Sequence, residues 1–82
     1  QNRIAKLQAR IKSLQKQLAK AQRNAGLQQK KANKFARQAR KAKGKQKEAL
    51  NRKAGSARRK AASERKRARN LKQRIAALKK QI

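Results

Sequence analysis

Lysine and arginine supply nearly all of the chemically active side chains in this sequence. Its 82 residues include 29 lysines and arginines and two acidic residues, Glu48 and Glu64, so the formal net charge is +27 at pH 7. Solvated helices usually alternate lysine with glutamate at four-residue spacing, which gives each charge a partner. Because such partners are missing along the whole chain, we expect an external polyanion to supply the opposite charge.

Phosphate is the anion that this mixture of side chains suits best. The arginine guanidinium can bind two phosphate oxygens at once, whereas lysine acts as a mobile point charge. Glutamine and asparagine, which are plentiful here, can donate hydrogen bonds to phosphate and sugar without adding charge. The residues predicted to contact nucleic acid are Arg3, Lys6, Arg10, Lys12, Lys16, Lys20, Arg23, Lys30, Lys31, Lys34, Arg37, Arg40, Lys41, Lys43, Lys45, Arg52, Lys53, Arg58, Arg59, Lys60, Arg65, Lys66, Arg67, Arg69, Lys72 and Arg74.

Residue types alone exclude most catalytic chemistry. The sequence has no cysteine and no histidine, which rules out disulfides, thiolate nucleophiles, zinc sites and imidazole bases. Ser13, Ser56 and Ser63 lack an evident base, although phosphorylation of the last two would weaken phosphate binding. No catalytic residue, metal, cofactor or small-molecule substrate is predicted, so we do not expect an enzyme. No apolar run is long enough to span a membrane, and no membrane partner is expected.

A hydrophobic pattern that reverses near Gly44 predicts how these cations are held. Two series of positions step by three and four, from Ile4 to Ala42 and from Lys47 to Ile82, and all of them are apolar except Gln28, Lys47 and Glu64. Such steps form one seam of an α-helix that faces a partner. The phase slips at Gly44, and glycine is favoured just beyond a helix end. The pattern therefore predicts an all-α, antiparallel two-helix coiled-coil hairpin as one domain over residues 1–82, with a first helix over about 2–42, a turn at 43–46 and a second helix over about 47–81.

Folding the chain back at Gly44 matches the two seams by size. Large residues meet at the open end, and small ones meet nearer the turn. A core this thin, combined with self-repulsion of the charges, should leave the isolated hairpin weakly folded at low salt, and a bound polyanion should stabilise it. The predicted pairs are Leu7–Ile82, Ile11–Leu78, Leu14–Ile75, Leu18–Leu71, Ala21–Ala68, Ala25–Glu64, Phe35–Ala54 and Ala39–Leu50.

Two other architectures stay open. Breaks at Gly26 and Gly55 would give a three-helix bundle, and an unbroken chain would give a single long helix in an oligomeric coiled coil. We favour the hairpin because the seam keeps its phase through both glycines. Glu64 on the seam also has two interpretations. It could fix the register as a buried polar residue or swing out to pair with Lys60 or Arg67, and we favour the second.

These features favour a non-enzymatic protein that binds nucleic acid without sequence preference and condenses or packages a genome. No helix-turn-helix, zinc-finger or RNP motif is present, and the lone aromatic residue, Phe35, argues against base stacking on single strands. Duplex DNA is the favoured partner, RNA remains open, and self-association along the nucleic acid is compatible with the pattern. The expected location is with the genome, in a virion interior, a nucleoid or a nucleus. In composition the chain resembles lysine- and arginine-rich chromatin and viral core proteins, with no shared motif.

Two further functions compete with this one. The chain could be a small basic protein bound to ribosomal RNA, or a structural coiled coil, natural or designed, with an acidic protein partner. The segment from Leu71 to Ile82 resembles idealised coiled-coil sequences, which keeps the structural alternative open. The sequence begins at Gln1 rather than methionine, as expected for a processed product or for part of a longer protein.

Overall fold

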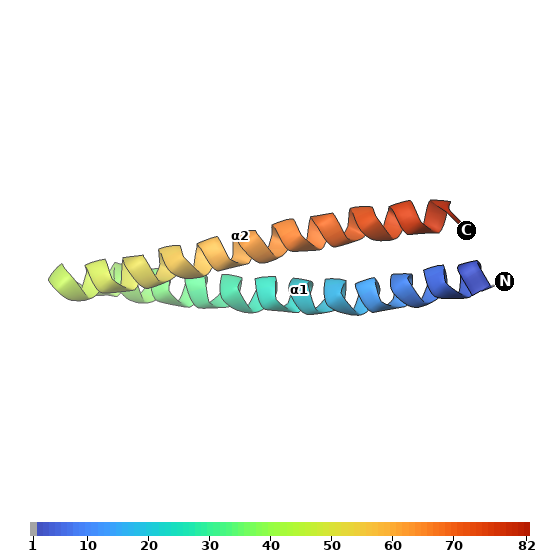
Figure 1. Cartoon of the computed structure of the whole chain (residues 1–82). Helices are drawn as coiled ribbons and strands as arrows, with labels where there is room; N and C mark the ends of the chain where they lie inside the picture. Colours follow the sequence, from blue (N-terminus) through green and yellow to red (C-terminus); the bar gives the residue numbers. More distant parts are fainter. Residues whose placement is uncertain (1) are drawn as a thin grey trace.

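The computed structural model describes residues 2–82 as two long helices joined by a two-residue connection. Helix α1 spans Asn2–Lys41 and helix α2 spans Gly44–Lys80. They pack antiparallel in a rod whose Cα atoms extend over 65 × 14 × 12 Å, with both chain ends at the same end of the rod (Figure 1). The predicted all-α helical hairpin is confirmed. Gln1, and with it the question of how the chain begins, lies outside the described residues.

Both helices run without interruption through their internal glycines. The chain contains no proline to break them, and most of its residue types have high helix propensity. Gly26 lies inside α1 and Gly55 lies inside α2, so the three-helix bundle is not formed. The break after Lys41 likewise excludes the single continuous helix.

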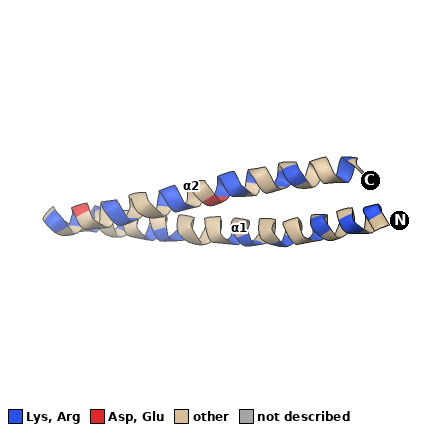
Figure 2. Ribbon diagram, viewed as in Figure 1, with Lys and Arg blue, Asp and Glu red and all other residues tan. Residues whose placement is uncertain are grey.

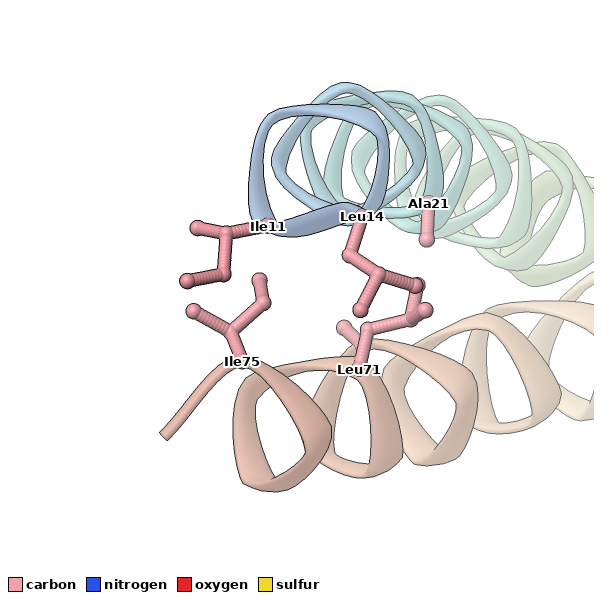
Figure 3. Close-up of a cluster of buried hydrophobic side chains, with 6 residues drawn as sticks. Ile11, Leu14, Ala21, Leu71 and Ile75 are labelled. Atoms are coloured by element: carbon pink, nitrogen blue, oxygen red, sulfur yellow. The ribbon is translucent and has the colours of Figure 1, made fainter. Parts of the chain in front are cut away.

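The core is a narrow seam between the two helices. One cluster contains every member of four predicted pairs: Ile11, Leu14, Ala21, Ala68, Leu71 and Ile75 are buried in it, and Leu18 and Leu78 pack against it. In Figure 3 the side chains of Ile11, Leu14, Leu71 and Ile75 point into the space between the helices. Burying a leucine or isoleucine side chain contributes about 1.5–3 kcal/mol, so this cluster near the open end supplies much of the hydrophobic stabilisation.

Alanine forms the seam between this cluster and the connection. As predicted, the large side chains lie toward the open end and the small ones lie nearer the turn. An alanine seam contributes less hydrophobic free energy per residue because each side chain buries only a methyl group. The buried alanines nearer the connection are Ala25, Ala32, Ala39, Ala54, Ala57 and Ala61.

The connection is shorter and earlier than the predicted turn at residues 43–46. Helix α1 closes with a hydrogen bond from the Ala42 N–H to the Ala39 carbonyl, with an N–O distance of 3.2 Å. Lys43 is extended, with φ −132° and ψ 154°, and Gly44 begins α2 with φ +62°. Glycine adopts this left-handed conformation at little cost. Gly44 therefore makes the reversal as the first residue of α2 rather than beyond the end of α1.

The predicted seam fails at both ends of its register. Ile82 lies beyond α2 and is 55% exposed, so the expected pair with Leu7 does not bury it, although Leu7 itself is buried. Ile4 is 46% exposed because α2 ends at Lys80 and has no residue left to cover it. Lys47, which was in phase with the second seam, is exposed. Near the connection and at the open end, the seam pattern in the sequence thus extends beyond the residues that pack between the helices.

Two glycine-to-alanine substitutions should have opposite effects on stability. Gly44→Ala forces an L-residue into the left-handed region and should lower the free energy of unfolding by about 1–2 kcal/mol. Gly26→Ala should raise it by about 0.5–1 kcal/mol, because a Cβ there has open space around it. Urea unfolding followed by circular dichroism at one salt concentration measures both. Equal effects of the two variants would contradict the positive φ at Gly44.

Candidate nucleic-acid interface

Every lysine and arginine in residues 2–82 is exposed to solvent. Because no charged or polar residue of the described chain is fully buried, the helices present all their cations outward, and Figure 2 shows them along the full length of both. All the residues predicted to contact nucleic acid are therefore accessible. The prediction omitted Lys47, Lys79 and Lys80, which are equally exposed. Lys47 was left out because its phase placed it on the seam.

One flank of the helix interface, the glutamine flank, carries a row of glutamines on α1. Here Arg65 Nη2 donates to Gln29 Oε1 at 2.6 Å, and Gln29 Nε2 donates to Asn33 Oδ1 at 3.1 Å. Residues seven apart share the same flank of a helix. Stepping one heptad in opposite directions from Gln29 and Arg65 therefore gives the other pairs of this flank. These pairs are Gln15–Lys79, Gln22–Lys72, Gln29–Arg65 and Ala36–Arg58.

The opposite flank, the lysine flank, follows a similar rule with one exception. Three surface grooves each contain a residue of α1 and a residue of α2 from this flank. Steps of seven residues from these three pairs give the remaining pairs of the flank. In every pair except one, a cation faces an uncharged amide. The pairs of the lysine flank are Arg10–Gln81, Gln17–Arg74, Asn24–Arg67, Lys31–Lys60 and Gln38–Lys53.

The exception lies in a groove that collects four lysines, which we call the lysine groove. Phe35 forms part of its floor and is half-buried. Lys53 Nζ lies 5.7 Å from the centroid of the Phe35 ring, a cation–π contact that contributes about 0.5–1 kcal/mol at an exposed site. The residues that line the lysine groove are Gln28, Lys31, Lys34, Phe35, Lys53, Ser56, Ala57 and Lys60.

The remaining cations extend the charged surface around the rod. A hollow on α1 near the connection is lined by Lys34, Arg37, Gln38, Arg40 and Lys41. Positions midway between seam residues, such as Lys16 between Leu14 and Leu18, lie on the outer side of each helix. Sequence reasoning found the cations but missed the pairing across the flanks. The heptad row Gln8, Gln15, Gln22 and Gln29 was the signal that could have revealed it.

Glu64 differs from the outward pairing that the sequence favoured. The residue is half-buried, and its Oε2 atom is buried without a hydrogen-bond partner. Its phase on α2 directs the side chain toward the seam. The neighbouring seam residues Ala61 and Ala68 are small, which leaves room for the carboxylate between the helices. The interface therefore contains one unsatisfied polar atom, a destabilising feature in so thin a core.

The described residues contain neither a membrane-spanning helix nor a metal-binding cluster. Neither α1 nor α2 is long and apolar enough to cross a membrane, and residues 2–82 bring together no group of three metal-binding side chains. No family model matches the chain, and no curated protein or solved structure matches it.

Replacing Glu64 by leucine should stabilise the hairpin. The substitution removes the buried oxygen that lacks a partner, so the free energy of unfolding should rise by about 1–3 kcal/mol. Glu48→Leu is the matched control, because Glu48 is an exposed acid on the same helix and its loss changes the net charge equally. Chemical unfolding measures both variants. A rise of equal size in both would show that the Glu64 carboxylate carries no special penalty.

Salt should stabilise the isolated protein. The Debye length falls from about 30 Å at 0.01 M salt to about 3 Å at 1 M, so added salt weakens repulsion among the exposed cations. Helicity and melting temperature, followed by circular dichroism, should both rise across this range. High helicity at 0.01 M salt, with a melting temperature that does not respond to salt, would contradict the proposed repulsion.

Proposed function

We propose that this protein is a non-enzymatic, sequence-independent nucleic-acid-binding protein that neutralises and condenses a genome, with duplex DNA as its favoured partner. The observation that carries the proposal is an entirely exposed set of 29 cations on a straight rod, with two acids to offset them. A folded protein does not retain an unbalanced charge of this size without destabilising its compact state. The compensating charge therefore comes from a partner.

The linear charge density of the rod matches that of a nucleic-acid duplex. A net charge of +27 over 65 Å corresponds to one positive charge per about 2.4 Å of rod, compared with one negative charge per about 1.7 Å of B-DNA axis. A hairpin aligned along a duplex would thus neutralise most of the charge on the segment it covers. A compact acidic protein offers no linear array of charge of this length.

Duplex binding fits the surface better than base recognition does. Lysine and arginine side chains contact phosphates without regard to sequence. Phe35, the one aromatic residue, is half-buried beneath Lys53 and is not free to stack on bases, as single-strand binding usually requires. The proposal therefore favours recognition of the duplex backbone, in DNA first and in RNA second.

Condensation follows from the distribution of cations around a thin rod. Cations occur on the glutamine flank at Arg65 and Lys72 and on the lysine flank at Lys53 and Lys60, and the outer sides of both helices add others. The Cα atoms span only 14 × 12 Å across the rod, so duplexes on opposite sides would be held close together. A single hairpin could therefore bridge two duplexes and neutralise part of the charge on each.

Binding to duplex DNA should be strong at low salt and should weaken steeply as salt is added. If about ten phosphates are contacted, log affinity should fall with log salt at a slope of roughly −9 on B-DNA. Fluorescence anisotropy on a DNA duplex, its sequence-shuffled counterpart, duplex RNA, a folded RNA and a single strand measures this. The same titration in a sedimentation assay should pellet long DNA near charge neutrality.

The other arms of this experiment separate the competing functions. Equal affinity for the two DNA duplexes is expected, and a strong preference for one of them would overturn sequence-independent binding. Preference for folded RNA over both duplexes would favour a ribosomal role. A shallow salt slope on every nucleic acid would exclude the packaging proposal.

A further inference from the structure

Charge pairing across the helix interface follows one rule, and the lysine groove breaks it. On both flanks, a cation of one helix faces an uncharged side chain of the other, as in Gln29–Arg65 and Gln38–Lys53. Lys31 and Lys60 are the like-charged exception among the flanking pairs of residues 2–82, and they line one groove. A cation facing an amide avoids repulsion across the interface, whereas two facing cations do not.

The exception lies in a groove between the helices that collects four lysines. Lys34 and Lys53 join Lys31 and Lys60 around the same groove, so each helix contributes two ammonium groups. The Gln28 amide and the Ser56 hydroxyl line it too and can donate hydrogen bonds to an anion. The Lys53 ammonium lies over the Phe35 ring, which lines the same groove.

We propose that the lysine groove is a specific site for a backbone phosphate of the bound nucleic acid. This inference rests on the proposed function and says where the hairpin holds the nucleic acid most tightly. A phosphate in the groove would lie between ammonium groups of both helices and replace their mutual repulsion by attraction to one anion. The hairpin would therefore bind the duplex first along its lysine flank.

Nearby groups do not already neutralise the groove. Glu64 lies one helical turn from Lys60 on α2, but it does not line the groove, and its Oε2 atom makes no hydrogen bond. On the glutamine flank, by contrast, Arg65 already donates to Gln29. Of the two flanks, the lysine flank thus holds the cations with the most to gain from an external anion.

Two double variants with equal charge loss test this site. Lys31→Gln with Lys60→Gln removes the facing pair from the groove. Lys16→Gln with Lys66→Gln removes one lysine from the outer side of each helix, away from the seam. Binding to one duplex DNA is measured against salt for both variants and the wild type, with circular dichroism as a check that each is folded. The single variant Lys31→Gln, which restores the amide–cation rule, is unfolded in urea without DNA.

The groove double variant should lose the one phosphate contact of the groove. Its salt slope should therefore be shallower by roughly 0.9, which corresponds to a loss of affinity of about 8-fold at 0.1 M salt if the affinities of the two proteins are equal at 1 M. The control should show less than half of that change. Lys31→Gln alone should unfold at a higher urea concentration than Lys16→Gln does.

Three results would each contradict either the phosphate site or the proposed function. Equal losses in the two double variants would show that the groove is no more than ordinary charged surface. A stabilised Lys31→Gln, together with a groove double variant whose salt slope matches that of the wild type, would show that the groove is strained without binding phosphate. Failure of the wild type to bind any duplex would instead remove the proposed function itself.

Discussion

Repulsion between two adjacent cationic helices is the constraint on which the rest of this structure depends. The seam that opposes it is narrow, and no large side chain in the described chain is completely shielded from solvent. Where two such helices meet, unfavourable charge pairs at the flanks could cancel the gain from a few leucines. The sequence avoids this by placing glutamine, asparagine or alanine opposite almost every flanking lysine or arginine. Avoiding charge repulsion at the flanks therefore contributes to the stability of the hairpin together with the burial of the seam.

The same constraint explains where the large seam residues lie. Near the connection, the two-residue link keeps the helices together by itself, because closing a short loop leaves little freedom to separate. Alanines suffice there. At the open end, far from the link, repulsion would push the arms apart. That is where Ile11, Leu14, Leu71 and Ile75 are buried. The seam residues therefore become larger with distance from the connection, because the connection restrains the separation of the helices less there.

Periodicity was enough to predict the hairpin, the position of the reversal near Gly44 and the membership of the hydrophobic cluster near the open end. The exact connection was not predictable from phase alone. A one-residue slip is compatible with several loop lengths, and the left-handed conformation at Gly44 decides between them. The exposure of Ile4 and Ile82 depends on where the partner helix ends, which a repeat cannot reveal. Counting charges identified the cationic surface but not the flank pairs, although these follow once the predicted seam register is extended to the flanks. The Gln29–Arg65 hydrogen bond shows one of them directly.

Two residues depart from the apolar seam and the cation–amide pairing of the flanks, and they lie next to each other. Glu64 leaves an unsatisfied carboxylate oxygen in the seam, and Lys60, one turn away, faces Lys31 across the lysine groove. Elsewhere, local choices agree with the fold. In natural proteins such local conflicts gather where function requires them. The Glu64 carboxylate does not line the groove, so the groove stays open to an external anion. If the proposed phosphate site is right, the hairpin thus gives up stability next to the groove that binds the anion.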